Sequence, residues 1–135
     1  MFEITRRYEL QAAHHLPETP KNHKCHRMHG HTYHVWVTIT GSPRPSDGWF
    51  MDFYDVDLLW DQVHAQLDHQ VLNDIEGLSN PTTENLCRWI WDVLTPELRA
   101  YCDKAKMARG NGTPRLAEIR VSENERSVVT YRNFQ

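Results

Sequence analysis

Hydrophobic and polar residues alternate along the first 14 positions of the chain, with one interruption at Arg6. A period of two is typical of a strand with one buried face. The mainly apolar face comprises Phe2, Ile4, Tyr8, Leu10, Ala12 and His14. The pattern returns between residues 29 and 40, where one face comprises His29, His31, Tyr33, Val35, Val37 and Ile39. The two segments predict two long strands, which are joined by a polar, proline-containing loop.

After a turn containing glycine and proline at residues 41–48, the period becomes helical. Apolar residues recur three and four positions apart, as on the buried side of an amphipathic helix. They are Val56, Leu59, Trp60, Val63 and Leu67. A second helix is expected from Thr82, whose hydroxyl can cap it, and Glu84 suits the positive end of its dipole. Its apolar stripe comprises Leu86, Ile90, Val93 and Leu94. Residues 68–81 and 103–115 are expected to form loops.

Two more strands are predicted near the C-terminus. Residues 117–123 alternate, and residues 127–132 can pair with them as a hairpin. The order of two strands, two helices and two strands predicts an α+β fold, in which two helices back an antiparallel, four-stranded sheet on one face. With 135 residues, the chain is expected to form a single domain, residues 1–135.

Composition narrows the class of protein. The net charge of −3 gives no basic surface of the kind that binds nucleic acid or an anionic membrane. The three cysteines are scattered, which argues against a disulfide framework and for a reducing compartment. The N-terminal residues lack the apolar core of a signal peptide, and no apolar run approaches the roughly 20 residues that span a bilayer. We therefore expect a cytoplasmic protein without nucleic-acid or membrane partners.

The segment KCHRMHGHTYHV, residues 24–35, holds one thiol and four imidazoles. His29 and His31 are two residues apart on a predicted strand, so their side chains project from the same face, roughly 6–7 Å apart. His14, at the end of the first strand's apolar face, is a candidate for a third ligand. Three histidines that leave a fourth position open are typical of catalytic zinc. The alternative is that the paired histidines are polar residues at the edge of the sheet.

Cys25 leaves two interpretations open. Its thiolate could complete a closed cysteine–histidine zinc site, although the chain has no second cysteine in C-x-x-C spacing. Alternatively, the thiolate stays free and acts as a base or nucleophile near the metal, whose charge would lower the pKa of the thiol.

Two acidic positions are candidates for the rest of a site. Asp68 precedes His69, and a carboxylate beside an imidazole can orient it and stabilise its charged form, as general acid–base catalysis requires. A plain surface loop is the alternative. Glu123 ends an apolar stripe, where an unpaired buried charge would be costly. Either Arg115 or Arg120 pairs with it, or a ligand with adjacent N–H donors does.

Several motifs together resemble the 6-pyruvoyltetrahydropterin synthase family. They are AAHHLP, HKCHRMHGH, GWFMDF, LDHQVLNDIEGLSNPTTENL with WIWD, and the segments VSE and TYR. Their order and spacing are preserved from about residue 8 to residue 132. The likeness is closer to the branch of 6-carboxy-5,6,7,8-tetrahydropterin synthases, which belongs to the queuosine pathway. Residues 99–116 are longer than the family pattern, and Asn124 replaces the family's usual threonine.

The resemblance implies a tunnelling fold (T-fold) whose subunits form an oligomeric β-barrel, with active sites between subunits. It implies a zinc-dependent (Zn2+) lyase that converts 7,8-dihydroneopterin triphosphate to 6-carboxy-5,6,7,8-tetrahydropterin, acetaldehyde and triphosphate. The alternatives are release of triphosphate alone, which gives 6-pyruvoyltetrahydropterin, and a non-catalytic zinc module.

The resemblance also assigns roles to single residues. The implied zinc ligands are His14, His29 and His31. The implied catalytic residues are Cys25, Asp68 and His69, and the implied pterin-binding residues are Glu123, Thr82 and Thr83. The other histidines match nothing functional and are expected in loops or on the surface: His15, His23, His26, His34 and His64.

Overall fold

The computed structural model describes residues 1–107, 110 and 112–134. Its main elements are β1 (Phe2–His14), β2 (His29–Gly41), α1 (Phe53–Leu67), β3 (Gln70–Val71), α2 (Thr83–Lys104), β4 (Arg115–Asn124) and β5 (Ser127–Tyr131). Both predicted helices and all four predicted strands are present. Because α2 continues to Lys104, it includes the first two residues of the loop predicted at 103–115. Residues 108, 109 and 111 of that predicted loop lie outside the described residues.

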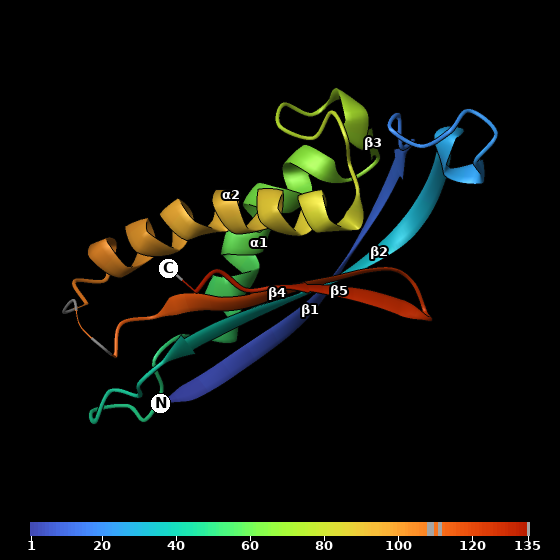
Figure 1. Ribbon diagram of the computed structural model, residues 1–135. Coiled ribbons are helices and arrows are strands. Elements are labelled where there is room, and N and C mark those ends of the chain that lie inside the picture. The colour runs from blue at the N-terminus through green and yellow to red at the C-terminus, as the bar shows by residue number, and fades with distance from the viewer. Residues whose placement is uncertain (108–109, 111, 135) are drawn as a thin grey trace.

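The strands form one sheet in the order β3-β1-β2-β4-β5 (Figure 1). The pairs β1–β2, β2–β4 and β4–β5 are antiparallel, as predicted. β3 is an addition that pairs in parallel with β1 at Ala12 and Ala13. The sheet is therefore mixed and has five strands, so the prediction of a four-stranded antiparallel sheet was wrong. A strand of two residues is too short to produce a visible alternation.

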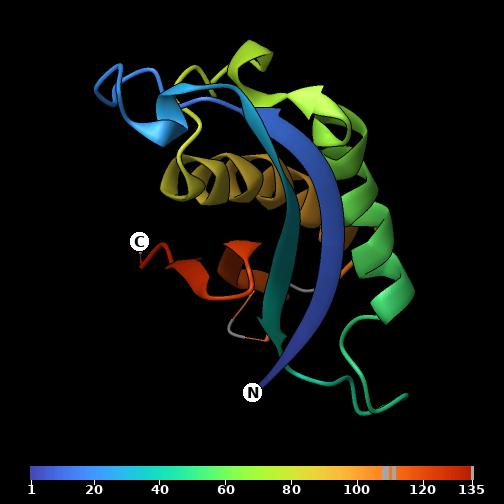
Figure 2. The same ribbon diagram turned by 90° about the vertical axis from the view of Figure 1, so that its right-hand side faces the viewer.

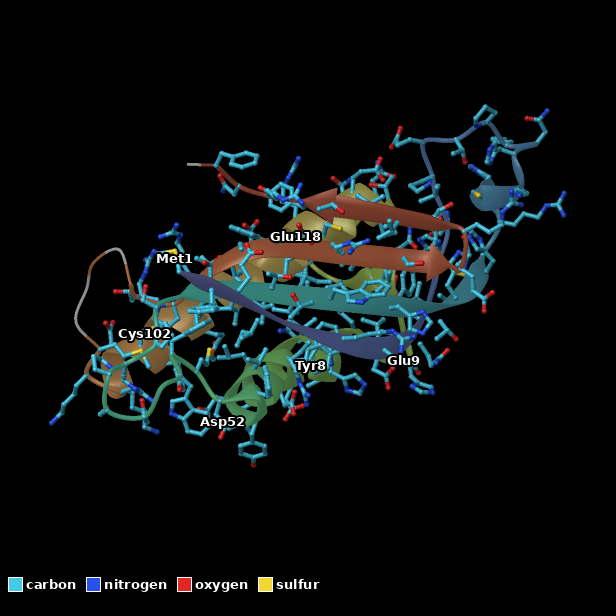
Figure 3. The ribbon with its side chains drawn as sticks, turned by 90° about the horizontal axis from the view of Figure 1, so that it is seen from below. Met1, Tyr8, Glu9, Asp52, Cys102 and Glu118 are labelled. Carbon is cyan, nitrogen blue, oxygen red and sulfur yellow. The ribbon has the colours of Figure 1, made fainter. Side chains whose placement is uncertain are left out.

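Both helices cover the same face of the sheet, which we call the helical face; on β2 it carries Tyr33, Val35, Val37 and Ile39. These four side chains are almost fully buried, and they pack in one core with the apolar stripes of α1 and α2. In the view from below, the strands lie in front of the helices (Figure 3). This second face, which we call the open face, carries polar pairs such as Gln11 with Thr32.

Arg6 belongs to the helical face even though it breaks the apolar pattern. Its guanidinium donates to both carboxylate oxygens of Asp57 on α1, at 3.1 and 2.9 Å. The Tyr8 hydroxyl donates to the same carboxylate at 2.6 Å. The charged residue in the strand is thus the partner of a helix residue, which holds α1 against β1.

The helix starts follow the predicted capping chemistry. Thr82 Oγ1 accepts the Asn85 N–H at 3.1 Å at the start of α2, and Asp52 caps α1 in the same way by accepting the Tyr54 N–H at 2.9 Å. In the part of the chain that the structure describes, neither helix is long and apolar enough to cross a membrane.

Three segments gather at one end of the molecule (Figures 1 and 2). They are the loop 15–28 with its 3-10 turn Lys24–His26, the connection between α1 and α2, and the turn between β4 and β5. This end contains the histidine-rich segment and the Asp68–His69 pair, so the fold brings most of the candidate residues to one region.

Candidate metal and acid–base site

Three histidines converge at the end of β1 and β2. The antiparallel register places His14 opposite His29, and the period of two places His31 on the same side as His29. One ring nitrogen from each lies within 4.8 Å of the other two. The predicted proximity of the three histidines is therefore confirmed, and it follows directly from strand register.

Backbone carbonyls orient two of these rings. His14 Nδ1 lies 2.8 Å from the Pro81 carbonyl oxygen, and His29 Nδ1 lies 2.7 Å from the Arg27 carbonyl oxygen. A carbonyl only accepts, so each Nδ1 carries the hydrogen and each Nε2 keeps a free lone pair. Such an outer hydrogen bond is the usual way to fix the tautomer and direction of a metal-binding histidine.

Two of the remaining ring nitrogens have no hydrogen-bond partner in the part of the chain that the structure describes. His14 Nε2 and His31 Nε2 are buried and have no hydrogen-bond partner among the described residues. Buried polar atoms without partners are rare in folded proteins and call for an explanation. A cation bound between the rings would satisfy both lone pairs at once, so the donor set fits a metal ion.

The electrostatics favour the neutral form of the imidazoles. Burial lowers the pKa of His14 and of His31 below the ordinary histidine value, and the neighbouring His29 lowers both further, although Glu123 opposes these shifts. Neutral imidazole is the form that binds metals. Three imidazole nitrogens suit zinc, as well as copper, iron and nickel.

Glu123 lies beside the histidines. Its Oε2 is 3.7 Å from His14 Nε2 and 3.5 Å from His31 Nε2, and its side chain is 32% exposed. Among the described residues, no ion pair between Glu123 and an arginine is present. The Arg120 guanidinium carbon instead lies over the Trp36 ring, 5.5 Å from its centroid, and Arg120 Nε is 3.9 Å from Glu118 Oε1. The carboxylate is thus available to a ligand that binds next to the three histidines.

Tyr33 is a residue of this cluster that the sequence reasoning did not single out. Its ring centroid is 5.5 Å from that of His31, and its buried hydroxyl has no partner among the described residues. Burial raises the pKa of the phenol, so it stays protonated and can donate. The continued period of two after His29 and His31 was a signal that could have identified it.

Asp68 and His69 form a tight pair at the end of α1. Asp68 Oδ2 accepts His69 Nδ1–H at 2.7 Å, and Oδ1 accepts the Gln11 N–H at 2.8 Å. The Gln11 N–H, followed by the His69 ring, lowers the pKa of the Asp68 carboxyl. His69 has a positive φ of 58°, and its N–H donates to the Gln11 carbonyl at 2.6 Å. The backbone of β1 therefore holds a conformation that non-glycine residues seldom adopt, as often happens at functional sites.

Among the described residues, no hydrogen bond or ion pair joins Asp68 or His69 to the three histidines. Gln11 lies on the open face, and the His69 side chain is 76% exposed. His69, His31, Gln11 and Thr32 are among the residues that line a hollow of about 450 Å3 over β1, β2 and β3. His14, in contrast, is buried on the helical face. The two predicted groups are each present, and His31 and His69 line one hollow, although no hydrogen bond or ion pair in the described residues joins the two groups.

Cys25 lies in the short 3-10 turn between the first two strands and is half-buried. Its carbonyl accepts the Leu16 N–H at 2.7 Å, which ties this turn to the residues just after His14. Among the described residues, the group that could hold a metal consists of the three histidines and does not include this sulfur. The geometry thus favours a free thiol, and its catalytic role remains a prediction.

The segment before α2 also contacts the cluster. Pro81, whose carbonyl orients His14, directly precedes Thr82 and Thr83. Asn124, the departure from the family pattern, accepts the Arg126 N–H through its side chain at 2.9 Å, so it stabilises the turn between β4 and β5. Both segments lie at the end of the molecule where Glu123 and the histidines meet.

A family model described as 6-pyruvoyl tetrahydropterin synthase matches residues 3–133. The chain belongs to this family. The 6-carboxy-5,6,7,8-tetrahydropterin synthase of Bacillus subtilis is 31% identical over 137 residues, which cover 97% of this chain and 85% of the relative. The 6-pyruvoyl tetrahydrobiopterin synthase of Dictyostelium discoideum is 34% identical over 113 residues, which cover 81% and 73%. The predicted family and the predicted enzyme class, a lyase, are confirmed.

The fold agrees with that of the family. The structure of 6-pyruvoyl tetrahydropterin synthase from Caenorhabditis elegans has a TM-score of 0.75 to this chain at 23% identity, and the match covers 98% of this chain and 95% of the other. The predicted α+β T-fold is therefore confirmed for the single chain.

Proposed function

We propose that this pterin lyase is zinc-dependent and converts 7,8-dihydroneopterin triphosphate to 6-carboxy-5,6,7,8-tetrahydropterin, acetaldehyde and triphosphate, as a step of queuosine biosynthesis. The observation that carries the proposal is the set of buried, unsatisfied imidazole nitrogens beside a carboxylate. The name of the Bacillus subtilis relative, which spans nearly the whole chain, supports the choice of product.

His14, His29 and His31 would hold the zinc ion through three nitrogens, which leaves a position for substrate as catalytic zinc sites do. When bound, zinc supplies a Lewis acid that makes the protons near the coordinated side-chain hydroxyls easier to remove. The carbonyls of Pro81 and Arg27 keep two of the rings in the required tautomer.

The remaining residues bind the substrate and move its protons. The Glu123 carboxylate would accept hydrogen bonds from adjacent N–H groups of the pterin, and its place 3.5 Å from His31 Nε2 would keep the ring next to the three histidines. Thr82 and Thr83 would contact the same ring. The Cys25 thiolate and the His69 imidazole would take and return protons, and each such step is worth about 10²–10⁴-fold in rate.

We further propose that the working enzyme is a homo-oligomer. The His69 side chain is 76% exposed, and no hydrogen bond or ion pair in the described residues joins it to the three histidines, so one chain alone leaves the acid–base pair unlinked to the site. A T-fold barrel of several copies would bring the pair of one chain to the histidines of another. The exposure of His69 in the single chain is the observation that favours this arrangement.

A second candidate is the release of triphosphate alone, with a product that keeps its three-carbon side chain. The observation that favours it is the 34% identity to the 6-pyruvoyl tetrahydrobiopterin synthase of Dictyostelium discoideum, which is close to the 31% identity to the Bacillus subtilis relative. The mass of the product separates the two reactions, because only the first one loses acetaldehyde.

The test is to incubate the zinc-loaded protein with 7,8-dihydroneopterin triphosphate and to measure product mass, triphosphate and acetaldehyde. We expect all three products of the first reaction, and we expect none from His29→Ala. A pyruvoyl product without acetaldehyde would select the second candidate. If zinc-loaded protein releases no triphosphate at all, both candidates are wrong.

A further inference from the structure

Asn73 has no role in the proposed mechanism, yet its side chain binds the residue that follows the candidate ligand His14. It lies in the 3-10 turn Leu72–Asp74, directly after β3. Its Oδ1 accepts the His15 N–H at 3.0 Å, and its Nδ2 donates to the His15 carbonyl at 2.9 Å. One carboxamide therefore satisfies both backbone groups of a residue that lies 58 positions earlier in the chain.

The Asn73 side chain continues the pairing of two strands. β3 pairs with Ala12 and Ala13 of β1, and then the chain turns at the fully buried Leu72. A carboxamide has the same acceptor oxygen and N–H donor as a peptide group. Asn73 can therefore bind the backbone of His15 as a longer strand would, just past the end of β1.

The same nitrogen reaches the segment that orients the ring of His14. Asn73 Nδ2 also donates, at 3.5 Å, to the carbonyl of Ser79, two residues before Pro81. The Pro81 carbonyl accepts His14 Nδ1–H at 2.8 Å. Asn73 thus contacts both the backbone next to His14 and the segment that carries the carbonyl directing its ring.

We propose that Asn73 is a positioning residue that holds the His14 imidazole in place for metal binding. It acts through the backbone of His15 and through residues 79–81, not by contact with the ion. All of these hydrogen bonds lie within one chain, so the argument is the same whichever subunit completes the active site. The inference rests on the proposed metal function of the three histidines.

Two substitutions separate the parts of this arrangement. Asn73→Ala loses all three hydrogen bonds, whereas Asn73→Asp keeps an acceptor for the His15 N–H and loses both donated bonds. The added negative charge of Asn73→Asp by itself favours a cation, so a lower metal affinity in this variant reports the lost donors. Loss of an outer partner of a metal-binding histidine lowers metal affinity by about 10–100-fold. Because Asn73 acts one step further out than the Pro81 carbonyl, we expect the lower end, about 10-fold.

The experiment measures the zinc Kd of the metal-stripped, full-length protein by competition with a chelator, at a temperature at which every metal-free variant is folded. We expect the Kd to rise about 10-fold in Asn73→Ala and in Asn73→Asp. The visible spectrum of the cobalt(II) form, which reports the arrangement of ligands around the ion, should change in both variants. A purely structural role for Asn73 would lower Tm and leave both measurements unchanged, because both are made on folded protein.

Tyr101→Phe is the matched control. It removes a hydrogen bond that also joins two elements, in which the Tyr101 hydroxyl on α2 donates to Asp55 on α1 at 2.8 Å. This variant should lower Tm but leave the zinc Kd within about twofold and the cobalt spectrum unchanged. The inference is overturned if the Asn73 variants behave like Tyr101→Phe. If the wild type binds neither zinc nor cobalt, the proposed metal function is wrong and the inference falls with it.

Discussion

Zinc should stabilise the protein strongly, because the folded chain holds three imidazole nitrogens together and the unfolded chain does not. The three ring nitrogens lie within 4.8 Å of one another, and carbonyls orient two of the rings, so binding requires little rearrangement. A ligand that binds only the folded state adds about 4 kcal/mol when its free concentration is 1,000 times Kd. For a chain of this size, each kcal/mol raises Tm by roughly 3–4 °C, so zinc should raise Tm by about 10 °C or more.

The assay is thermal unfolding of metal-stripped protein with and without zinc, at one fixed protein concentration. His14→Ala and His29→Ala should lose the zinc-dependent rise in Tm. His34→Ala is the matched control, because it removes a histidine from the open face of the same strand as His31, and it should keep the full rise. The reasoning is refuted if His29→Ala keeps the rise, or if His34→Ala loses it as completely as the two ligand variants do.

The other predictions concern the roles of single residues. Cys25→Ala and His69→Gln should keep one zinc per chain but lower kcat by about 10²–10⁴-fold; loss of zinc in Cys25→Ala, measured by metal analysis, would make the thiol a ligand. Glu123→Gln should weaken pterin binding by about 10–100-fold, because hydrogen bonds to a charged group are worth about 1.5–3 kcal/mol. Glu125→Gln, in the adjacent turn, is its control, and equal affinities measured by calorimetry would rule out the clamp. Tyr33→Phe should raise the Tm of the metal-free protein, since it removes a buried hydroxyl without a partner at about 1–3 kcal/mol; a large fall in Tm would show that this hydroxyl has a structural partner.

The strands and the histidine cluster were predictable because both depend on local periodicity. Residues that are two positions apart on a strand lie on the same face, and this rule placed His29 with His31 without any tertiary information. His14 joined them because consecutive long strands usually pair, and here the antiparallel register sets it opposite His29.

Features that depend on backbone atoms or on distant segments could not be predicted in this way. The carbonyls of Pro81 and Arg27 that orient the rings have no signature in side-chain chemistry. The two-residue strand β3 is too short to alternate, and yet it fixes Asp68 and His69 beside Gln11. The exposed position of His69 depends on how the chain returns from α1 to the edge of the sheet at β3, which motif spacing does not encode.

The central claim is that three imidazoles bind one zinc ion while the Cys25 sulfur stays off it. X-ray absorption spectroscopy at the zinc edge, on the zinc-loaded protein without substrate, measures these bonds directly. We predict three nitrogen ligands at about 2.0–2.1 Å and no sulfur ligand. A zinc–sulfur distance of about 2.3 Å in the wild type, lost in Cys25→Ala, would contradict the account.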